Sequence, residues 1–193
     1  MEISMPVTLR MGDLMSDDEF FQFCQINDTL EFERDSQGNV IVMSRTGSLS
    51  GLVNTHFTGH LFSWNERLGL GVMFSSSTGF TLPNGAVRSP DASWIRNERW
   101  DRLSEDEKEK FAPICPDFVV EVRSKSDEPK YLSDKMKEYI ANGARLGWLI
   151  DRFEKKAYIF RQDGSVETAE INAVLSGEDV LPGFTLDLGE LIK

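Results

Sequence analysis

Apolar residues recur every three or four positions in three stretches of the chain, and this spacing predicts three main helices. The first begins after Ser16, where Ser16 and Glu19 have the spacing of a capping box. The second covers residues 48–68. The third covers residues 131–142 and ends at Gly143, the residue type that a left-handed helix end favours. One apolar stripe follows the second helix and consists of Leu49, Val53, Phe57, Leu61, Trp64 and Leu68.

Short apolar runs between the helices predict strands. Residues 30–34 and 40–43 flank the turn sequence 35–39 and predict a β-hairpin near the N-terminus. Residues 118–123 and 146–151 are the most apolar runs, and they flank the third helix. Further strands are predicted at residues 72–75, 79–82, 86–87, 91–95, 157–160 and 165–170. The charged residues 98–110 predict one or two short helices.

This alternation of helices and strands predicts an α/β fold, in which a mixed central β-sheet is flanked by helices and preceded by an N-terminal β-hairpin. The strand–helix–strand order of residues 118–151 predicts that its two strands are parallel. No internal repeat and no long linker interrupts the 193 residues, so we expect one domain over residues 1–193.

The formal net charge of −11 argues against a general nucleic-acid-binding protein, because such proteins expose basic surfaces. It does not exclude an enzyme that acts on DNA, since a carboxylate-rich metal site itself adds negative charge. Cys24 and Cys115 have no metal or redox spacing. No apolar run has the length of a membrane span or the pattern of a secretion signal, so we expect a cytoplasmic protein with reduced thiols.

A glutamate lies within the apolar strand at residues 117–123. Side chains alternate between the two faces of a strand, so Asp117, Glu121 and Arg123 share the face opposite the most apolar one. Burial of a glutamate is costly unless the carboxylate is paired or binds a metal. Glu121 therefore either forms an ion pair with a neighbouring basic residue or acts as a metal ligand.

A second acidic residue, Asp91, follows Pro90 at the start of another apolar strand. An aspartate at such a place is also common in turns. On adjacent strands, however, Asp91 and Glu121 would supply the one or two carboxylates that typically hold Mg²⁺. Hydrolysis of a phosphodiester uses a divalent cation to activate water and to neutralise charge on the phosphate. The pair therefore predicts a site for Mg²⁺ or Mn²⁺.

A lysine beside two such carboxylates would orient the attacking water or stabilise the charge of the transition state. Two residues beyond Glu121 the chain has Arg123, which is a poor proton acceptor. We favour Lys135, because it lies at the border of the buried face of the helix over residues 131–142, whereas Lys137 points away. An ordinary flanking lysine with a packed stem explains the same pattern of Lys135 equally well.

Four motifs in the same order resemble the Uma family of restriction endonuclease-like proteins, which belongs to the PD-(D/E)xK superfamily. The motifs are Ser89-Pro90-Asp91-Ala92-Ser93-Trp94, Pro116-Asp117-Phe118-Val119-Val120-Glu121, Lys135-Met136 with Tyr139 and Gly143, and Leu146-Gly147-Trp148-Leu149-Ile150-Asp151. Phe32-Glu33, Gly38 and residues 181–184 extend the likeness over nearly the whole chain. One departure is Lys125, which stands where the family usually has proline.

The resemblance implies a restriction-endonuclease-like fold and a metal-dependent endonuclease that hydrolyses DNA. It assigns metal binding to Asp91 and makes Glu121 the acidic member of the (D/E)xK element, with Lys135 as the replacement for the strand lysine. Glu33 and Asp117 fall at acidic positions typical of the family, and Glu33 is either a further metal ligand or a residue that stabilises the hairpin. A homodimer is expected from the resemblance alone.

Two other functions stay open. The negative charge and the missing strand lysine favour a weakly active or inactive nuclease-fold domain that binds nucleic acid or a protein. His56 and His60 lie four residues apart on a helix, a spacing that fits zinc, but they lack a third ligand. His60 also lies near the apolar stripe, where a hydrogen-bonded residue at the edge of the core is the simpler explanation.

Basic and aromatic residues add further candidates. Arg123, Lys125, Lys130 and Arg145 are candidate phosphate contacts, although a solvated surface explains them equally well. Trp94, Trp100 and Trp148 are expected in the core rather than as surfaces for stacking bases.

Overall fold

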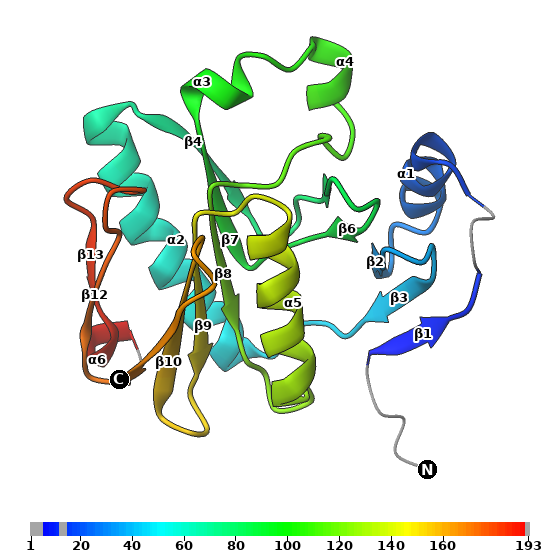
Figure 1. Cartoon of the computed structure of the whole chain (residues 1–193). Coiled ribbons are helices and arrows are strands. Elements are labelled where there is room, and N and C mark those ends of the chain that lie inside the picture. The colour runs from blue at the N-terminus through cyan, green and yellow to red at the C-terminus, as the bar shows by residue number, and fades with distance from the viewer. Residues whose placement is uncertain (1–5, 12–14, 192–193) are drawn as a thin grey trace.

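A six-stranded mixed sheet forms the centre of the structure, a computed structural model that describes residues 6–11 and 15–191 (Figure 1). The strand order is β11-β10-β9-β8-β7-β4. Strands β8 and β9 run parallel, which confirms the prediction from their strand–helix–strand order, and their other neighbours are antiparallel. The strands are β4 (Gly71–Ser75), β7 (Ala92–Arg96), β8 (Phe118–Val122), β9 (Leu146–Asp151), β10 (Lys156–Arg161) and β11 (Val166–Glu170).

Two helices cover opposite faces of this sheet: α2 (Ser48–Leu68) lies on one face and α5 (Pro129–Ala141) on the other (Figure 1). The stripe predicted for α2 is buried only in its middle, and Leu49 and Leu68 are 59% and 49% exposed. A helix of this length spans roughly 31 Å, whereas a five-residue strand spans roughly 17 Å. The two ends of α2 therefore extend past the sheet.

A second sheet has five strands in the order β1-β3-β2-β6-β5. The predicted hairpin forms its middle, but the short strands predicted near residues 79–87 belong to this sheet and not to the central one. The pair Arg34–Val87 joins them to the hairpin. Helix α1 (Asp17–Ile26) packs on the sheet and has the predicted capping box. The strands are β1 (Val7–Leu9), β2 (Glu31–Arg34), β3 (Val40–Met43), β5 (Phe80–Thr81) and β6 (Val87–Arg88).

The remaining elements are short. The charged segment forms two small helices as predicted. Near the C-terminus, a two-stranded sheet and a final helical turn pack on the α2 face of the central sheet. Trp94 and Trp148 are buried in the core and Trp100 packs against it, as predicted. The elements are α3 (Asn97–Trp100), α4 (Glu105–Lys108), β12 (Val174–Ser176), β13 (Thr185–Asp187) and α6 (Leu188–Leu191).

Two further predictions concern the whole chain: that it has no membrane-spanning segment and that it forms one domain. Over the described ranges, the structure contains no helix long and apolar enough to cross a membrane. The presence of one domain over residues 1–193 stays a prediction.

Helix α5 approaches the sheet closely at Gly147 in β9. A Cβ atom on this glycine would lie 2.4 Å from Cε of Met136 and 3.2 Å from Cγ2 of Val119. A larger residue at position 147 would therefore displace the end of the Met136 side chain. Because Lys135 precedes Met136, the close contact also brings the lysine to the sheet at the level of β8.

Candidate active site

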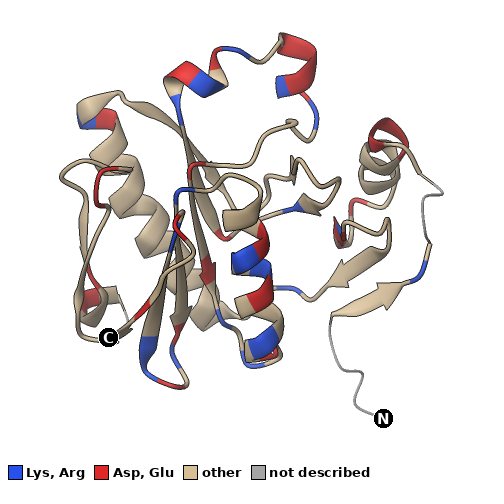
Figure 2. Cartoon of the chain, viewed as in Figure 1, with Lys and Arg blue, Asp and Glu red and all other residues tan. Residues whose placement is uncertain are grey.

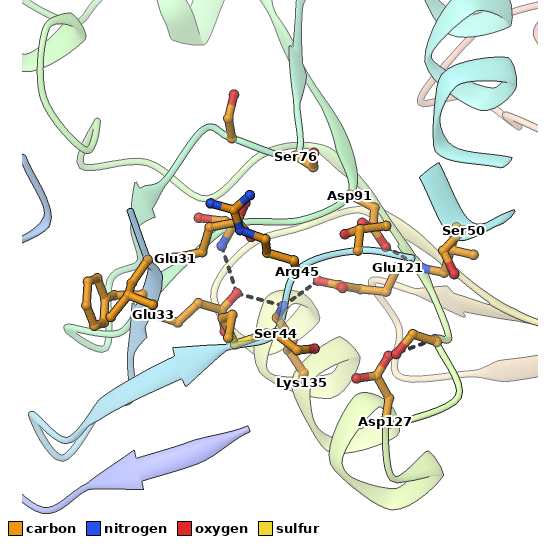
Figure 3. A pocket seen from close by; sticks show the side chains of 18 of the residues that line it. Glu31, Glu33, Ser44, Arg45, Ser50, Ser76, Asp91, Glu121, Asp127 and Lys135 are labelled. Carbon is orange, nitrogen blue, oxygen red and sulfur yellow. Dashed lines mark hydrogen bonds and ion pairs between the residues drawn. The ribbon is translucent and has the colours of Figure 1, made fainter. Parts of the chain in front are cut away.

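A pocket of about 340 Å³ lies where the N-terminal sheet meets the central sheet. Its lining includes Glu33 from β2, Asp91 just before β7, Glu121 from β8 and Lys135 from α5. Figure 3 shows these four side chains directed toward one another. The structure thus brings together four of the residues singled out from the sequence, and they come from four separate segments of the chain.

Lys135 lies between two carboxylates at the bottom of the pocket. Its Nζ is 2.7 Å from Oε1 of Glu33 and 2.7 Å from Oε1 of Glu121, and its side chain is only 2% exposed. Burial alone would lower the pKa of Lys135, but the neighbouring carboxylates of Glu121 and Glu33 raise it above the ordinary lysine value. The side chain of Lys135 is therefore an ammonium group with a fixed position. Tyr139 helps to fix its partner, because it donates a hydrogen bond to Glu121 Oε1 at 3.1 Å.

Glu33 connects the hairpin to the rest of the site. Its Oε1 accepts the backbone N–H of Ser89 at 3.0 Å, and its Oε2 lies 3.0 Å from Nη1 of Arg88, which also binds Glu138 at 2.7 Å. Burial opposes ionisation of Glu33, but Lys135 and Arg88 hold its pKa below the ordinary value. Both oxygens of Glu33 thus have partners, and this geometry favours the hairpin-stabilising role over the role of a metal ligand.

Asp91 is oriented by two hydrogen bonds. Its Oδ2 accepts the backbone N–H of Val122 at 2.7 Å, and its Oδ1 accepts Nδ2 of Asn54 at 2.6 Å. Burial raises the pKa of Asp91, although these hydrogen bonds and Lys135 oppose the shift. The amide oxygen Oδ1 of Asn54 is itself buried and has no hydrogen-bond partner among the residues that the structure describes. An oxygen acceptor without a partner thus lies next to Asp91.

Glu121 is the acid most affected by its surroundings. Burial raises its pKa to about 8, and the carboxylates of Asp91 and Glu33 act in the same direction while Lys135 opposes them. The two buried acids Glu33 and Glu121 and the partly buried Asp91 therefore lie close together around the single ammonium group of Lys135. A cation bound at Asp91 and Glu121 would relieve this repulsion, because a positive charge favours the ionised form of both acids.

The residues present fit a divalent cation such as Mg²⁺. The donors at Asp91, Glu121 and Asn54 are all hard oxygen atoms, and Mg²⁺ is usually held by one or two carboxylates while water and substrate oxygens complete the octahedron. Within the described ranges no group of three or more His, Cys, Asp and Glu side chains has an arrangement that would hold a metal. The protein would thus supply only part of the coordination shell.

Two other predicted site residues do not line the pocket. Asp117 lies at the opposite end of β8, where it binds Nη1 of Arg99 at 3.1 Å and accepts the backbone N–H of Arg96 at 3.0 Å. It shares a face with Glu121, but the two residues are four positions apart, which is roughly 13 Å along a strand. Arg123 binds Asp151 at 2.8 Å instead of the site acids. Lys135 therefore is the basic residue next to Glu121.

Other candidates from the sequence lie elsewhere. Arg145, just before β9, binds Asp179 and does not line the pocket. Lys125 and Lys130 are exposed, the first on the segment before α5 and the second at the start of α5. His56 and His60 are both exposed, so His60 is not at the edge of the core. The described residues offer them no third ligand for zinc.

Two residues of the site were not predicted from the sequence: Asp127 lines the pocket, and Asn54 donates a hydrogen bond to Asp91. The only signal for Asn54 was its position beside Val53 in the apolar stripe of the long helix. Asp127 lines the pocket and accepts the backbone N–H of Ser124 at 2.7 Å, which fixes the loop after β8. A loop residue of this kind carries no periodicity, and only the folded loop reveals its direction.

The raised pKa of Glu121 predicts a pH-dependent stability. The folded protein keeps a proton on Glu121 that the unfolded chain loses above its ordinary pKa of 4.5. The metal-free protein should therefore lose stability as the pH rises from 4.5 toward about 8. Urea denaturation with EDTA should show a smaller loss in Glu121→Gln. The exposed control Glu109→Gln should behave like the wild type, and equal slopes in all three proteins would contradict the assignment.

Comparisons with known proteins show a fold that this chain shares and the family to which it belongs. The fold is similar to the crystal structure described as "a putative nuclease belonging to DUF820 from Anabaena variabilis ATCC 29413", with a TM-score of 0.73 and 19% sequence identity over 92% of this chain and 97% of that chain. Residues 17–189 match the family model "Uma2: Putative restriction endonuclease". The chain belongs to the Uma2 family. No curated protein matches its sequence.

Proposed function

We propose that this protein is a metal-dependent endonuclease that hydrolyses phosphodiester bonds in DNA and has the restriction-endonuclease-like fold of the PD-(D/E)xK superfamily. The observation that carries the proposal is the convergence of Asp91, Glu121 and Lys135 in one pocket. Membership of the Uma2 family supports it. DNA and, from the resemblance, a second copy of the chain are the partners that this function predicts.

Each of the three residues has a defined task. Asp91 and Glu121 would hold Mg²⁺ or Mn²⁺, and such a cation, when bound, activates water and neutralises charge on the phosphate. Lys135 is held as an ammonium group by Glu33, so it donates hydrogen bonds to phosphate oxygens or to the attacking water and does not accept a proton. Asn54 fixes the direction of the Asp91 carboxylate.

The remaining lining includes groups that can contact a polyanion, although Asp28, Glu31 and Asp127 also line the pocket. Hydroxyl groups donate hydrogen bonds to phosphate oxygens without adding charge, and Arg45 adds one guanidinium to the lining. The hydroxyl-bearing residues of the lining are Ser44, Thr46, Ser50, Ser76, Ser77, Ser89, Ser124 and Tyr131. Contacts of this kind position a phosphate backbone, whereas a general basic surface is not required.

Removal of the metal tests the function directly. Supercoiled and single-stranded DNA should be nicked or cut by the wild type with Mg²⁺ or Mn²⁺ and remain intact with EDTA, and added excess metal should restore cleavage. In the same preparations, Mn²⁺ at about 100 times its dissociation constant should stabilise the fold by about 2.7 kcal/mol. Cleavage that EDTA leaves unchanged would contradict the proposal. A folded protein that neither cuts DNA nor gains stability with metal would favour the binding-module alternative.

A further inference from the structure

The turn between β9 and β10 presents an exposed aromatic ring next to the candidate site. Phe153 is 50% exposed, although it lies between two core strands. The backbone of the turn is fixed because Oδ1 of Asp151 accepts the backbone N–H groups of Phe153 at 2.9 Å and Glu154 at 3.0 Å. The ring is therefore held in solvent by an ordered turn and is not part of a loose loop.

Two guanidinium groups lie over this ring. Cζ of Arg123 is 5.3 Å and Cζ of Arg152 is 5.5 Å from the ring centroid. Arg123 is fixed by its ion pair with Asp151 at 2.8 Å, and Arg152 donates a hydrogen bond from Nη2 to Oγ of Ser50 at 2.9 Å. We call Phe153, Arg123 and Arg152 the Phe153 platform.

The platform is connected directly to the pocket. Ser50, the hydrogen-bond partner of Arg152, lines the pocket, and so does Ser124, which follows Arg123 in the chain. Nε of Arg152 is buried and has no hydrogen-bond partner within the described ranges, so this arginine retains an unused donor. The platform therefore lies on the side of the pocket that Ser50 and Ser124 form.

A groove of about 280 Å³ continues from the platform along the start of α5. Arg123 and Lys130 contribute positive charge to its lining, while Asp151 and Glu154 contribute negative charge. Figure 2 shows blue and red segments mixed at this end of the molecule, at the start of β10 and the start of α5. Because the charges are mixed, electrostatic attraction alone does not explain what this surface binds.

Resting on the proposed function, we propose that the Phe153 platform binds an unpaired base of the DNA strand beside the phosphate that is cut. An exposed aromatic ring stacks on any base, and arginine adds cation–π and phosphate contacts. In a duplex the base faces are already covered by neighbouring bases, so the ring contacts only unpaired DNA. Stacking also does not depend on the net charge, which suits a protein of net charge −11.

Binding of a single-stranded oligonucleotide in EDTA tests this proposal without cleavage. An oligonucleotide with one 2-aminopurine should lose fluorescence on the wild type, because stacking quenches this base. Phe153→Ala should lose the quenching and bind single-stranded DNA about fivefold to a hundredfold more weakly, with unchanged duplex binding. Phe153→Trp should retain both. The matched control is Phe62→Ala, because Phe62 is 51% exposed on α2, and this variant should behave like the wild type.

The outcomes separate this proposal from the nuclease proposal. Wild-type quenching and affinity in Phe153→Ala would overturn the platform, and so would equal losses on duplex and single-stranded DNA. If metal-dependent cleavage persists in that case, the nuclease proposal stands without the platform. If the wild type never cuts DNA but Phe153→Ala alone loses the binding, the platform stands as a nucleic-acid contact and the nuclease proposal fails.

Discussion

Asp91→Ala is expected to lower metal-dependent DNA cleavage by about three orders of magnitude, because it removes one of the two carboxylates that would hold the cation. The substitution also leaves the backbone N–H of Val122 and the amide of Asn54 without their acceptor. Asp91→Asn keeps the shape and an acceptor oxygen, so it separates loss of metal binding from loss of local structure. Both should reduce the initial rate of plasmid nicking.

The exposed residue Asp101 supplies the matched control, and Asp101→Asn should cut DNA at the wild-type rate. The metal should stabilise Asp101→Asn and the wild type against thermal unfolding and should have little effect on either Asp91 variant. Cleavage by folded Asp91→Asn at the wild-type rate would remove Asp91 from the catalytic site. Asparagine at position 91 could still bind metal weakly, whereas alanine cannot. Cleavage by Asp91→Ala at the wild-type rate would therefore refute the site as a whole.

Lys135→Met is expected to have the largest effect on stability. It leaves the buried carboxylate of Glu33 and the carboxyl group of Glu121 without the ammonium group that lies 2.7 Å from each of them. Removal of one partner from a buried ion pair typically costs about 3–5 kcal/mol. Cleavage should also fall, by about 100- to 1000-fold, because a positive charge at the phosphate is lost. Urea denaturation and initial cleavage rates measure the two effects.

A double variant separates folding from catalysis. Glu33→Gln combined with Lys135→Met removes one uncompensated charge, so it should recover part of the stability but none of the cleavage. Lys137→Met is the control on the same helix, because that side chain is 62% exposed. If the double variant recovers cleavage together with stability, Lys135 has a purely structural role and the proposed donor of hydrogen bonds must be another group.

The sequence predicted the helices and the main strands because their apolar periods are long and regular. It also placed Lys135 at the border of a buried face, and the structure brings this residue to Glu121. The alternation of side chains along a strand predicted that Asp117 and Glu121 share a face. It did not predict that Asp117 lies too far along the strand to reach the pocket. The metal-binding and catalytic roles themselves stay predictions.

Other features depend on tertiary contacts that no local pattern encodes. Strands β5 and β6 have two residues each, too few for a period, so their pairing with the hairpin was not predictable. The direction of Asn54 depends on how α2 packs against the segment before β7. The partners of Glu33, which lie 55 or more positions further along the chain, become visible only in the folded structure.

The ion pairs of Lys135 also fasten two sheets to each other, since Glu33 belongs to the N-terminal sheet and Glu121 to the central one. Opening of the seam between the sheets would break one of these pairs and release the ammonium group from its place. Under the proposed function, closure of the seam and readiness for catalysis would therefore be coupled. Bound metal and DNA should shift the seam toward the closed state, and slower amide hydrogen exchange in β2 would record that shift.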